Sequence, residues 1–210
     1  MGKRVVAFND ITKLKSEGSF DVTITEATEF KVVAEGDQNI VDALYITQEQ
    51  GECSISFKPG CYTNYTLAVK VFMPKAEIVE LNGSGNIAIG NFGSQEKISL
   101  ILDGSGNINI DKLKHLTELK LAIEGSGDIK LNGDTETTSL TAAINGSGDI
   151  KAERLKTKNA KLDINGSGNI EIQVSESANV NISGSGDVWI MGNPKLQKSI
   201  SGSGDVHIRN

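Results

Sequence analysis

The sequence predicts an all-β fold, a parallel right-handed β-helix (a β-solenoid) of about seven coils, and three observations support this prediction. The tripeptide Gly-Ser-Gly occurs seven times, each time followed by Asn or Asp and then by Ile or Val. The copies start 18 to 21 residues apart, a spacing that is typical of stacked repeats. Aliphatic residues alternate with mostly polar ones on both sides of each copy, which indicates a strand before it and a strand after it.

Each Gly-Ser-Gly copy is expected to form a sharp corner between these two strands. Such a corner needs backbone angles with φ > 0, which glycine adopts without steric cost. The Ser and Asn/Asp side chains can bond backbone N–H groups that the corner leaves unpaired. The predicted corner glycines are Gly83, Gly85, Gly104, Gly106, Gly125, Gly127, Gly146, Gly148, Gly166, Gly168, Gly184, Gly186, Gly202 and Gly204.

Two short strands in each repeat cannot bury their apolar faces alone. The position two residues before each first glycine is aliphatic in all seven copies, and so is the position that follows Asn or Asp. If successive copies stack in register, these side chains pile up inside the solenoid, and each strand pairs with its equivalent one repeat away. The many Ile and Val residues fit this arrangement, because β-branched side chains pack well on a pleated surface.

Residues 1–80 lack the tripeptide but still contain several strand-like stretches. The segment 18–24 reads as a degenerate repeat, with Phe20 in place of the second glycine, and it lies close to three periods before Gly83. We therefore expect 1–80 to be an irregular N-terminal β region that caps or continues the rod, and 81–210 to form the regular repeats. A small separate sandwich ending near Pro74 is the alternative.

Composition narrows the possible functions. The 210 residues include 23 Gly and 3 Pro, aromatic residues make up 5%, and the formal net charge is -6. The acidic balance argues against a nucleic-acid partner, for which a basic patch is expected. No stretch approaches the roughly 20 apolar residues of a membrane span. The start, Met1-Gly2-Lys3-Arg4, leads directly into a strand-like segment, so we expect either a cytosolic protein or one whose export signal is missing from this sequence.

Cys53 and Cys61 are the only cysteines, and they flank a segment with a turn signal at Pro59-Gly60. A disulfide between them would suit an oxidising compartment, whereas two free thiols are the alternative. Both possibilities stay open at this point. With only two histidines, no Cys/His spacing supports a zinc site, and the sequence predicts no cofactor.

Stacked corners would bring the seven Asn/Asp side chains into a ladder. Adjacent aspartates, Asp128 with Asp149 and Asp187 with Asp205, would repel each other unless they are solvated, hydrogen-bonded or bridged by a cation. We expect a solvated ladder that is hydrogen-bonded to the backbone. Calcium bound along these four aspartates is the alternative, although calcium needs several oxygen ligands and three ladder positions are neutral Asn.

The outward-facing rows favour binding over catalysis. Glycoside hydrolysis needs two carboxylates that flank the scissile bond, and the outward rows are chemically mixed, so we predict no catalytic residues. Trp189 is the one large aromatic residue that is outward-phased in the rod, and it is the candidate ligand-binding residue. The alternative is that a loop folds back over it.

The end of the rod poses a separate question, because an unpaired strand edge invites the addition of another strand. We expect the last coil to be covered by a loop such as residues 193–199, or by a second molecule in an end-to-end homo-oligomer.

The repeated Gly-Ser-Gly-Asp-Ile/Val pattern, preceded by Val5-Val6-Ala7-Phe8-Asn9-Asp10-Ile11 and by the degenerate repeat at 18–24, resembles the bacterial putative auto-transporter adhesin, head GIN-domain family. The resemblance covers essentially the whole chain, and it implies a β-helical protein of the periplasm, outer membrane or cell surface, with no catalytic residues to transfer. The chain departs from the family in using Asn at three ladder positions and in lacking the signal.

We therefore predict a non-enzymatic, adhesin-like binding module that presents an extended β-helix face to an unknown protein or glycan. A structural or self-assembling scaffold is the second hypothesis, and a carbohydrate-active β-helix enzyme is the third.

Overall fold

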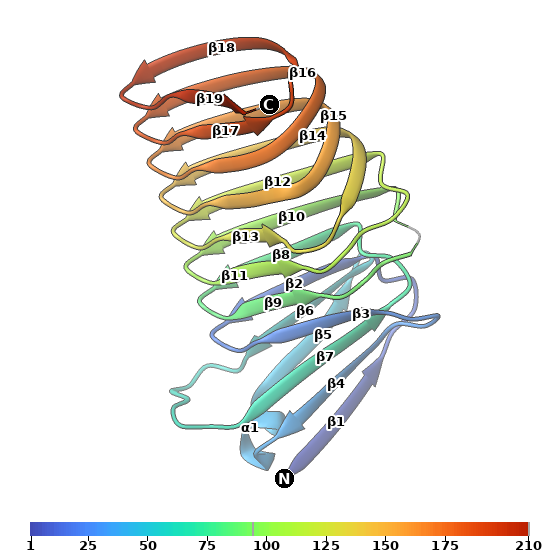
Figure 1. The fold of residues 1–210 in the computed structure, drawn as a ribbon. Helices are drawn as coiled ribbons and strands as arrows, with labels where there is room; N and C mark the ends of the chain where they lie inside the picture. Colours follow the sequence, from blue (N-terminus) through green and yellow to red (C-terminus); the bar gives the residue numbers. More distant parts are fainter. Residues whose placement is uncertain (94, 210) are drawn as a thin grey trace.

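A computed structural model describes residues 1–93 and 95–209 and shows a rod of stacked coils with the two termini at opposite ends (Figure 1). The chain is 66% strand and 3% helix, so the predicted all-β solenoid is confirmed. The regular coils are built from β8 (Ile78–Gly83), β9 (Asn86–Ile89), β10 (Lys97–Gly104), β11 (Asn107–Ile110), β12 (Glu118–Gly125), β13 (Ile129–Leu131), β14 (Thr135–Gly146), β15 (Ile150–Gly166), β16 (Ile170–Gly184), β17 (Val188–Met191), β18 (Lys195–Gly202) and β19 (Val206–Arg209).

Two parallel ladders of strands run along the rod, one on each side of the glycine corners. The first joins β8, β10, β12 and β14 to the later parts of β15 and β16, and then to β18. The second joins β9, β11 and β13 to the early parts of β15 and β16, and then to β17 and β19. The register pairs equivalent motif residues, from Gly83 with Gly104 to Gly184 with Gly202. The seven motifs enclose about six turns, one fewer than expected.

The interior of the coils is aliphatic. The column that begins at Leu81 continues through Leu102, Ile123, Ile144, Ile164 and Ile182, and every one of these side chains is buried. Fully burying an aliphatic side chain of this size stabilises the folded state by roughly 1.5–3 kcal/mol. The stacked columns are therefore the main source of stability of a rod whose coils contact only their neighbours.

Neither glycine of a motif leaves room for a Cβ against the preceding coil, and only the first also has a positive φ. The first glycine has a positive φ in all seven copies, between 131° at Gly202 and 145° at Gly146. The second has no such φ, and a Cβ there would lie only 1.8–2.1 Å from a backbone carbonyl oxygen of the preceding coil. Only the first glycine therefore meets the predicted requirement for φ > 0, and the second is required by the close approach of neighbouring coils.

The coil shortens at one bend of the rod, where β15 pairs with β16. The register shifts between Ala152 and Lys156, which leaves residues 153–155 without partners in β16, and it shifts back by one residue between Thr157 and Asn159. The two shifts account for the change of period from 20 to 18 residues. The bend keeps its interior filled, because Leu155 and Thr157 are both buried.

The first 80 residues extend both ladders and then change to antiparallel pairing. This region contains β1 (Gly2–Ala7), β2 (Lys13–Gly18), β3 (Val22–Glu26), β4 (Lys31–Gly36), α1 (Gln38–Ala43), β5 (Leu44–Glu49), β6 (Glu52–Phe57) and β7 (Leu67–Met73). The degenerate repeat lies in register with the first regular copy: β2 pairs with β8, Gly18 opposite Gly83, and β3 pairs with β9.

Antiparallel strands form the outer layers of this N-terminal end. Strand β6 pairs in parallel with β2, and β7 pairs in parallel with β3. Strand β5 then pairs with β6, β4 with β7, and β1 with β4, all antiparallel. The short helix α1 buries Ile40, Val41 and Ala43 at this end (Figure 1). The helix has six residues, and no helix in the described part of the chain is long and apolar enough to cross a membrane.

Candidate functional site

The Asn/Asp side chains form a continuous hydrogen-bonded ladder along the ridge of corners. The Oδ1 atom of each residue accepts the backbone N–H of the equivalent residue in the next coil, over donor–acceptor distances of 2.7–3.2 Å. The ladder begins at Asp21 of the degenerate repeat and ends at Asp205. Each side chain thus takes up an N–H group that faces it across the gap between coils.

A lysine lies between the first pair of adjacent aspartates. The Nζ atom of Lys151 is 3.1 Å from Asp128 Oδ2 and 3.2 Å from Asp149 Oδ2. The hydrogen bond that Lys151 donates to Asp128 is the main influence that raises the pKa of Lys151, so its ammonium group remains charged. This ammonium occupies the position that the calcium alternative requires for a bound ion. Among the described residues, no group of three or more His, Cys, Asp or Glu side chains could hold a metal ion.

Trp189 lies on the outer face of the second ladder, in a row formed by successive coils. Glu171 is its partner in the preceding coil and His207 its partner in the next one. The indole stacks on the His207 imidazole, with ring centroids 5.3 Å apart and an interplanar angle of 19°, and the Arg209 guanidinium lies 6.0 Å from the indole centroid. Trp189 is partly exposed. Within the described residues, the ring contacts of Trp189 come from side chains of its own sheet, His207 and Arg209, and not from a loop.

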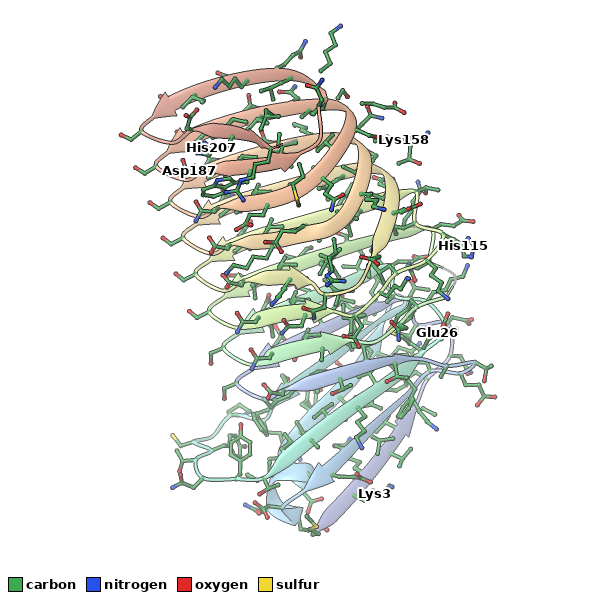
Figure 2. The ribbon with its side chains drawn as sticks, viewed as in Figure 1. Lys3, Glu26, His115, Lys158, Asp187 and His207 are labelled. Atoms are coloured by element: carbon green, nitrogen blue, oxygen red, sulfur yellow. The ribbon has the colours of Figure 1, made fainter. Side chains whose placement is uncertain are left out.

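We call Glu171, Trp189, His207 and Arg209 the tryptophan cluster. Figure 2 shows its His207 near the C-terminal end of the rod. A hydrogen bond with Glu153, reinforced by partial burial, raises the pKa of Glu171, while Arg209 and Lys151 act in the opposite direction. The cluster therefore combines an aromatic surface with a carboxyl group that keeps its proton more readily than usual and with two basic groups.

A shallow groove of about 540 Å³ adjoins the cluster at the bend where the coil shortens. Met191 connects the two features, since it follows Trp189 by two residues on the same outer face and lines the groove. Val174 contributes apolar surface to the groove, and Lys156 and Lys158 contribute positive charge. In Figure 2, Lys158 lies on the opposite side of the rod from His207. The volume falls within the range of small-molecule sites.

The two cysteines lie in different environments, one buried and one exposed. Cys53 is fully buried on β6 opposite Leu14, and burial raises the pKa of its thiol to about 12. Cys61 is exposed, in the connection between β6 and β7, and both thiols are free. The possible Cys53–Cys61 disulfide is therefore not formed, because the inward-facing strand position and the exposed connection hold the two thiols apart.

The connection between β6 and β7 carries aromatic residues that sequence reasoning could not place. Tyr62 stacks on Phe57 with centroids 4.6 Å apart, and Tyr65 meets the same ring edge-on at 5.6 Å. These contacts use the two tyrosines to anchor the connection to β6. Tyr45, on β5, is instead 57% exposed.

The family model described as "Putative auto-transporter adhesin, head GIN domain" matches residues 10–194. The chain belongs to this family. The resemblance seen in the sequence is thus confirmed, and the head GIN-domain protein described here is of an adhesin-like class. Among curated proteins, nothing matches the chain.

Several solved structures share the fold of this head GIN-domain protein. A putative adhesin from Bacteroides fragilis is 19% identical, with a TM-score of 0.88 over 99% of this chain and 96% of the other. A putative adhesin from Parabacteroides distasonis is 20% identical, with a TM-score of 0.76 and the same coverage. A putative lipid binding protein from Parabacteroides distasonis is 21% identical, with a TM-score of 0.76 over 100% of this chain and 96% of the other. At these identities the similarity establishes the fold alone.

Proposed function

We propose that this head GIN-domain protein is a non-enzymatic binding module of the bacterial cell envelope, and that it recognises a protein or glycan ligand through the outer face of its solenoid. The observation that carries the proposal is the tryptophan cluster, which joins the groove at the bend through Met191. A partly exposed indole surrounded by charged groups is the kind of surface residue that dominates recognition energetics. Membership of an adhesin-like family supports the same conclusion.

The arrangement of carboxylates gives no support to hydrolysis. A glycosidase holds two carboxyl groups apart, on either side of the scissile bond. Glu153 and Glu171 instead share a hydrogen bond on one outer face. The ladder aspartates are likewise engaged, since each Oδ1 atom from Asp128 to Asp187 accepts a backbone N–H.

The experiment that tests this proposal is a glycan array, followed by titration of any ligand found, with wild type, Trp189→Ala and Asn109→Ala. Asn109 lies in the same outward row, several coils from the cluster, and is the matched control. Loss of the indole is expected to weaken binding about tenfold or more, equivalent to roughly 1.4 kcal/mol, whereas Asn109→Ala should bind as wild type does. Equal affinities of the two variants would contradict the proposal.

The same titration should include protein ligands and a lipid dispersion, because one structure of the same fold is described as a lipid binding protein. A lipid that binds with unchanged affinity to Trp189→Ala would direct attention away from the cluster. Binding of a lipid that is lost in Trp189→Ala would keep the site and change the proposed ligand class.

A self-assembling scaffold is the second candidate function. The observation that favours it is the open end of the rod, where Ile208 is 41% exposed. The paired charges of Lys198 and Asp205 at that end oppose it.

A further inference from the structure

The last coil of the rod presents two strand edges. Within residues 1–93 and 95–209, β18 pairs only with β16, and β19 pairs only with β17. The predicted covering loop is not formed, because Lys195–Ser199 are themselves part of β18. Leu196 and Ile200 are only partly buried at this end. Unpaired parallel edges with apolar side chains are a template for a further strand.

By register, Lys198 occupies the aliphatic interior column in this last coil, and its side chain is 45% exposed at the open end. The register pairs Lys198 with Val180, and the column continues downward through Leu162 and Ala142. In the regular coils, all the residues that precede Lys198 in the column are buried and apolar. They are Val79, Leu100, Leu121, Ala142, Leu162 and Val180. A positive charge thus replaces an aliphatic side chain at the one level that no later coil covers in the described structure.

Asp205 completes this arrangement from the corner of the same coil. Its Oδ1 atom lies 3.4 Å from Lys198 Nζ and accepts the backbone N–H of Val206 at 2.7 Å. In every earlier coil, the equivalent oxygen accepts an N–H group from the next coil. The acceptor that would receive a further coil is therefore already engaged within its own coil.

We infer that Lys198 and Asp205 form an end cap that prevents a second copy of this chain from adding to the open edge. A strand laid over β18 would bury the Lys198 ammonium among aliphatic side chains, and an unpaired buried charge is strongly unfavourable. To continue the Asn/Asp ladder, the added strand would also have to displace the Lys198 ammonium and the Val206 backbone N–H from Asp205 Oδ1.

The second copy whose addition is prevented would make contact through its own C-terminal end. The N-terminal end carries antiparallel strands and α1, so its outer layer does not repeat the coil that ends in β18 and β19. Contact between two C-terminal ends uses the same patch on both molecules and closes as a dimer. Without the cap, the expected product is therefore a dimer and not a fibre.

Sedimentation velocity over a concentration series tests this inference, with wild type, Lys198→Val, Lys198→Glu and Gln197→Val. Gln197 is exposed and neighbours Lys198 on β18, outside the interior column, so Gln197→Val adds the same apolar side chain at a matched control position. Wild type and Gln197→Val should sediment as monomers of 22.3 kDa at all concentrations. Lys198→Val should shift with concentration toward the dimer.

Lys198→Glu separates charge from shape, since it keeps a charge in the column and should remain monomeric. Circular dichroism of each variant confirms that the fold is retained, which is expected because the substitutions lie on the last coil. The inference is overturned if Lys198→Val stays monomeric, if Gln197→Val or Lys198→Glu associates equally, or if association grows without limit. A wild-type dimer would also overturn it.

Discussion

The regular coils and the degenerate first coil use the same corner in different ways. In the regular coils, the second glycine of the motif lies against a carbonyl oxygen of the coil beneath it, and no side chain fits. In the first coil the same position is Phe20, whose ring is buried and packs edge-on against Phe57 at 5.2 Å. The comparison teaches that the glycine is needed only where an equivalent corner lies beneath. Where an irregular connection lies there instead, a large side chain can fill the space.

The largest expected effect comes from placing a side chain at a regular corner. In Gly127→Ala the new Cβ would lie 1.8 Å from the Gly106 carbonyl oxygen, a contact that only separation of the coils can relieve. We expect a loss of about 4 kcal/mol or more in the free energy of unfolding, measured by urea denaturation. Gly93→Ala is the control, since its Cβ would meet only the Glu26 carboxylate, at 3.4 Å. A Gly127→Ala variant as stable as Gly93→Ala would break the comparison.

Making the first coil resemble the others should also destabilise the protein. Phe20→Gly restores the repeat motif but removes a buried ring that contacts Phe57. The expected loss is about 3–5 kcal/mol in the free energy of unfolding, the range for truncating a buried Phe. Tyr45→Ala, at an exposed position of the same region, should change stability by no more than about 0.5 kcal/mol. A stabilised Phe20→Gly protein would show that the motif is preferred in every coil.

A smaller effect is expected at the ladder, where the regular coils place two aspartates in succession. Lys151→Met removes the ammonium between Asp128 and Asp149 and should cost about 0.5–1 kcal/mol at neutral pH, because the ion pairs are partly exposed to solvent. Lys130→Met, in the same outward row one coil earlier, is the control.

The pH dependence of that effect follows from the raised pKa of Lys151. A raised pKa means that the stabilisation is fully present below the lysine's ordinary pKa and is lost as the pH rises through the raised value. The gap in urea midpoint between wild type and Lys151→Met should therefore be constant around neutral pH and close in strongly alkaline solution. A difference in urea midpoint that is largest in alkaline solution would contradict this assignment of the effect to the charged Lys151.

The smallest effect is expected in the tryptophan cluster. The pKa of Glu171 is raised, so its protonated form is favoured in the folded protein, and that contribution is lost as the pH rises through the raised value. Glu171→Gln should thus be more stable than wild type at neutral pH by about 0.5 kcal/mol. This difference in stability, measured by thermal melting, should shrink as the pH falls into the range in which carboxyl groups take up protons. Glu124→Gln, at an exposed corner of another coil, is the control.

The architecture was predictable because one motif repeats at nearly constant spacing. The spacing alone sets the register of the aliphatic columns, and it identified the corner ridge on which Asp128 and Asp149 adjoin. It could not locate residues 153–155 as the place where the coil shortens, since motif spacing reports only the net change. Nor could it distinguish the two glycines of a corner, which depends on the distance between coils.

The candidate site was only partly predictable. Trp189 was identified, but its stacking partner was not, although His207 follows it by the same 18 residues that separate the last motifs. The same spacing places Lys198 after Val180, so a lysine in register with the aliphatic column was visible in the sequence once the register was known. The contact between Glu153 and Glu171 depends on the bend in β15, and the spacing carries no signal for it.

The ladder bonds that Oδ1 atoms accept all point one way, since each coil donates its Asn/Asp backbone N–H to a side-chain oxygen of the coil before it. The neighbouring main-chain bonds, such as Ile108 N–H to the Asp128 carbonyl, point the other way. During synthesis, the ladder N–H of every new coil therefore finds its acceptor already in place on the segment that left the ribosome before it.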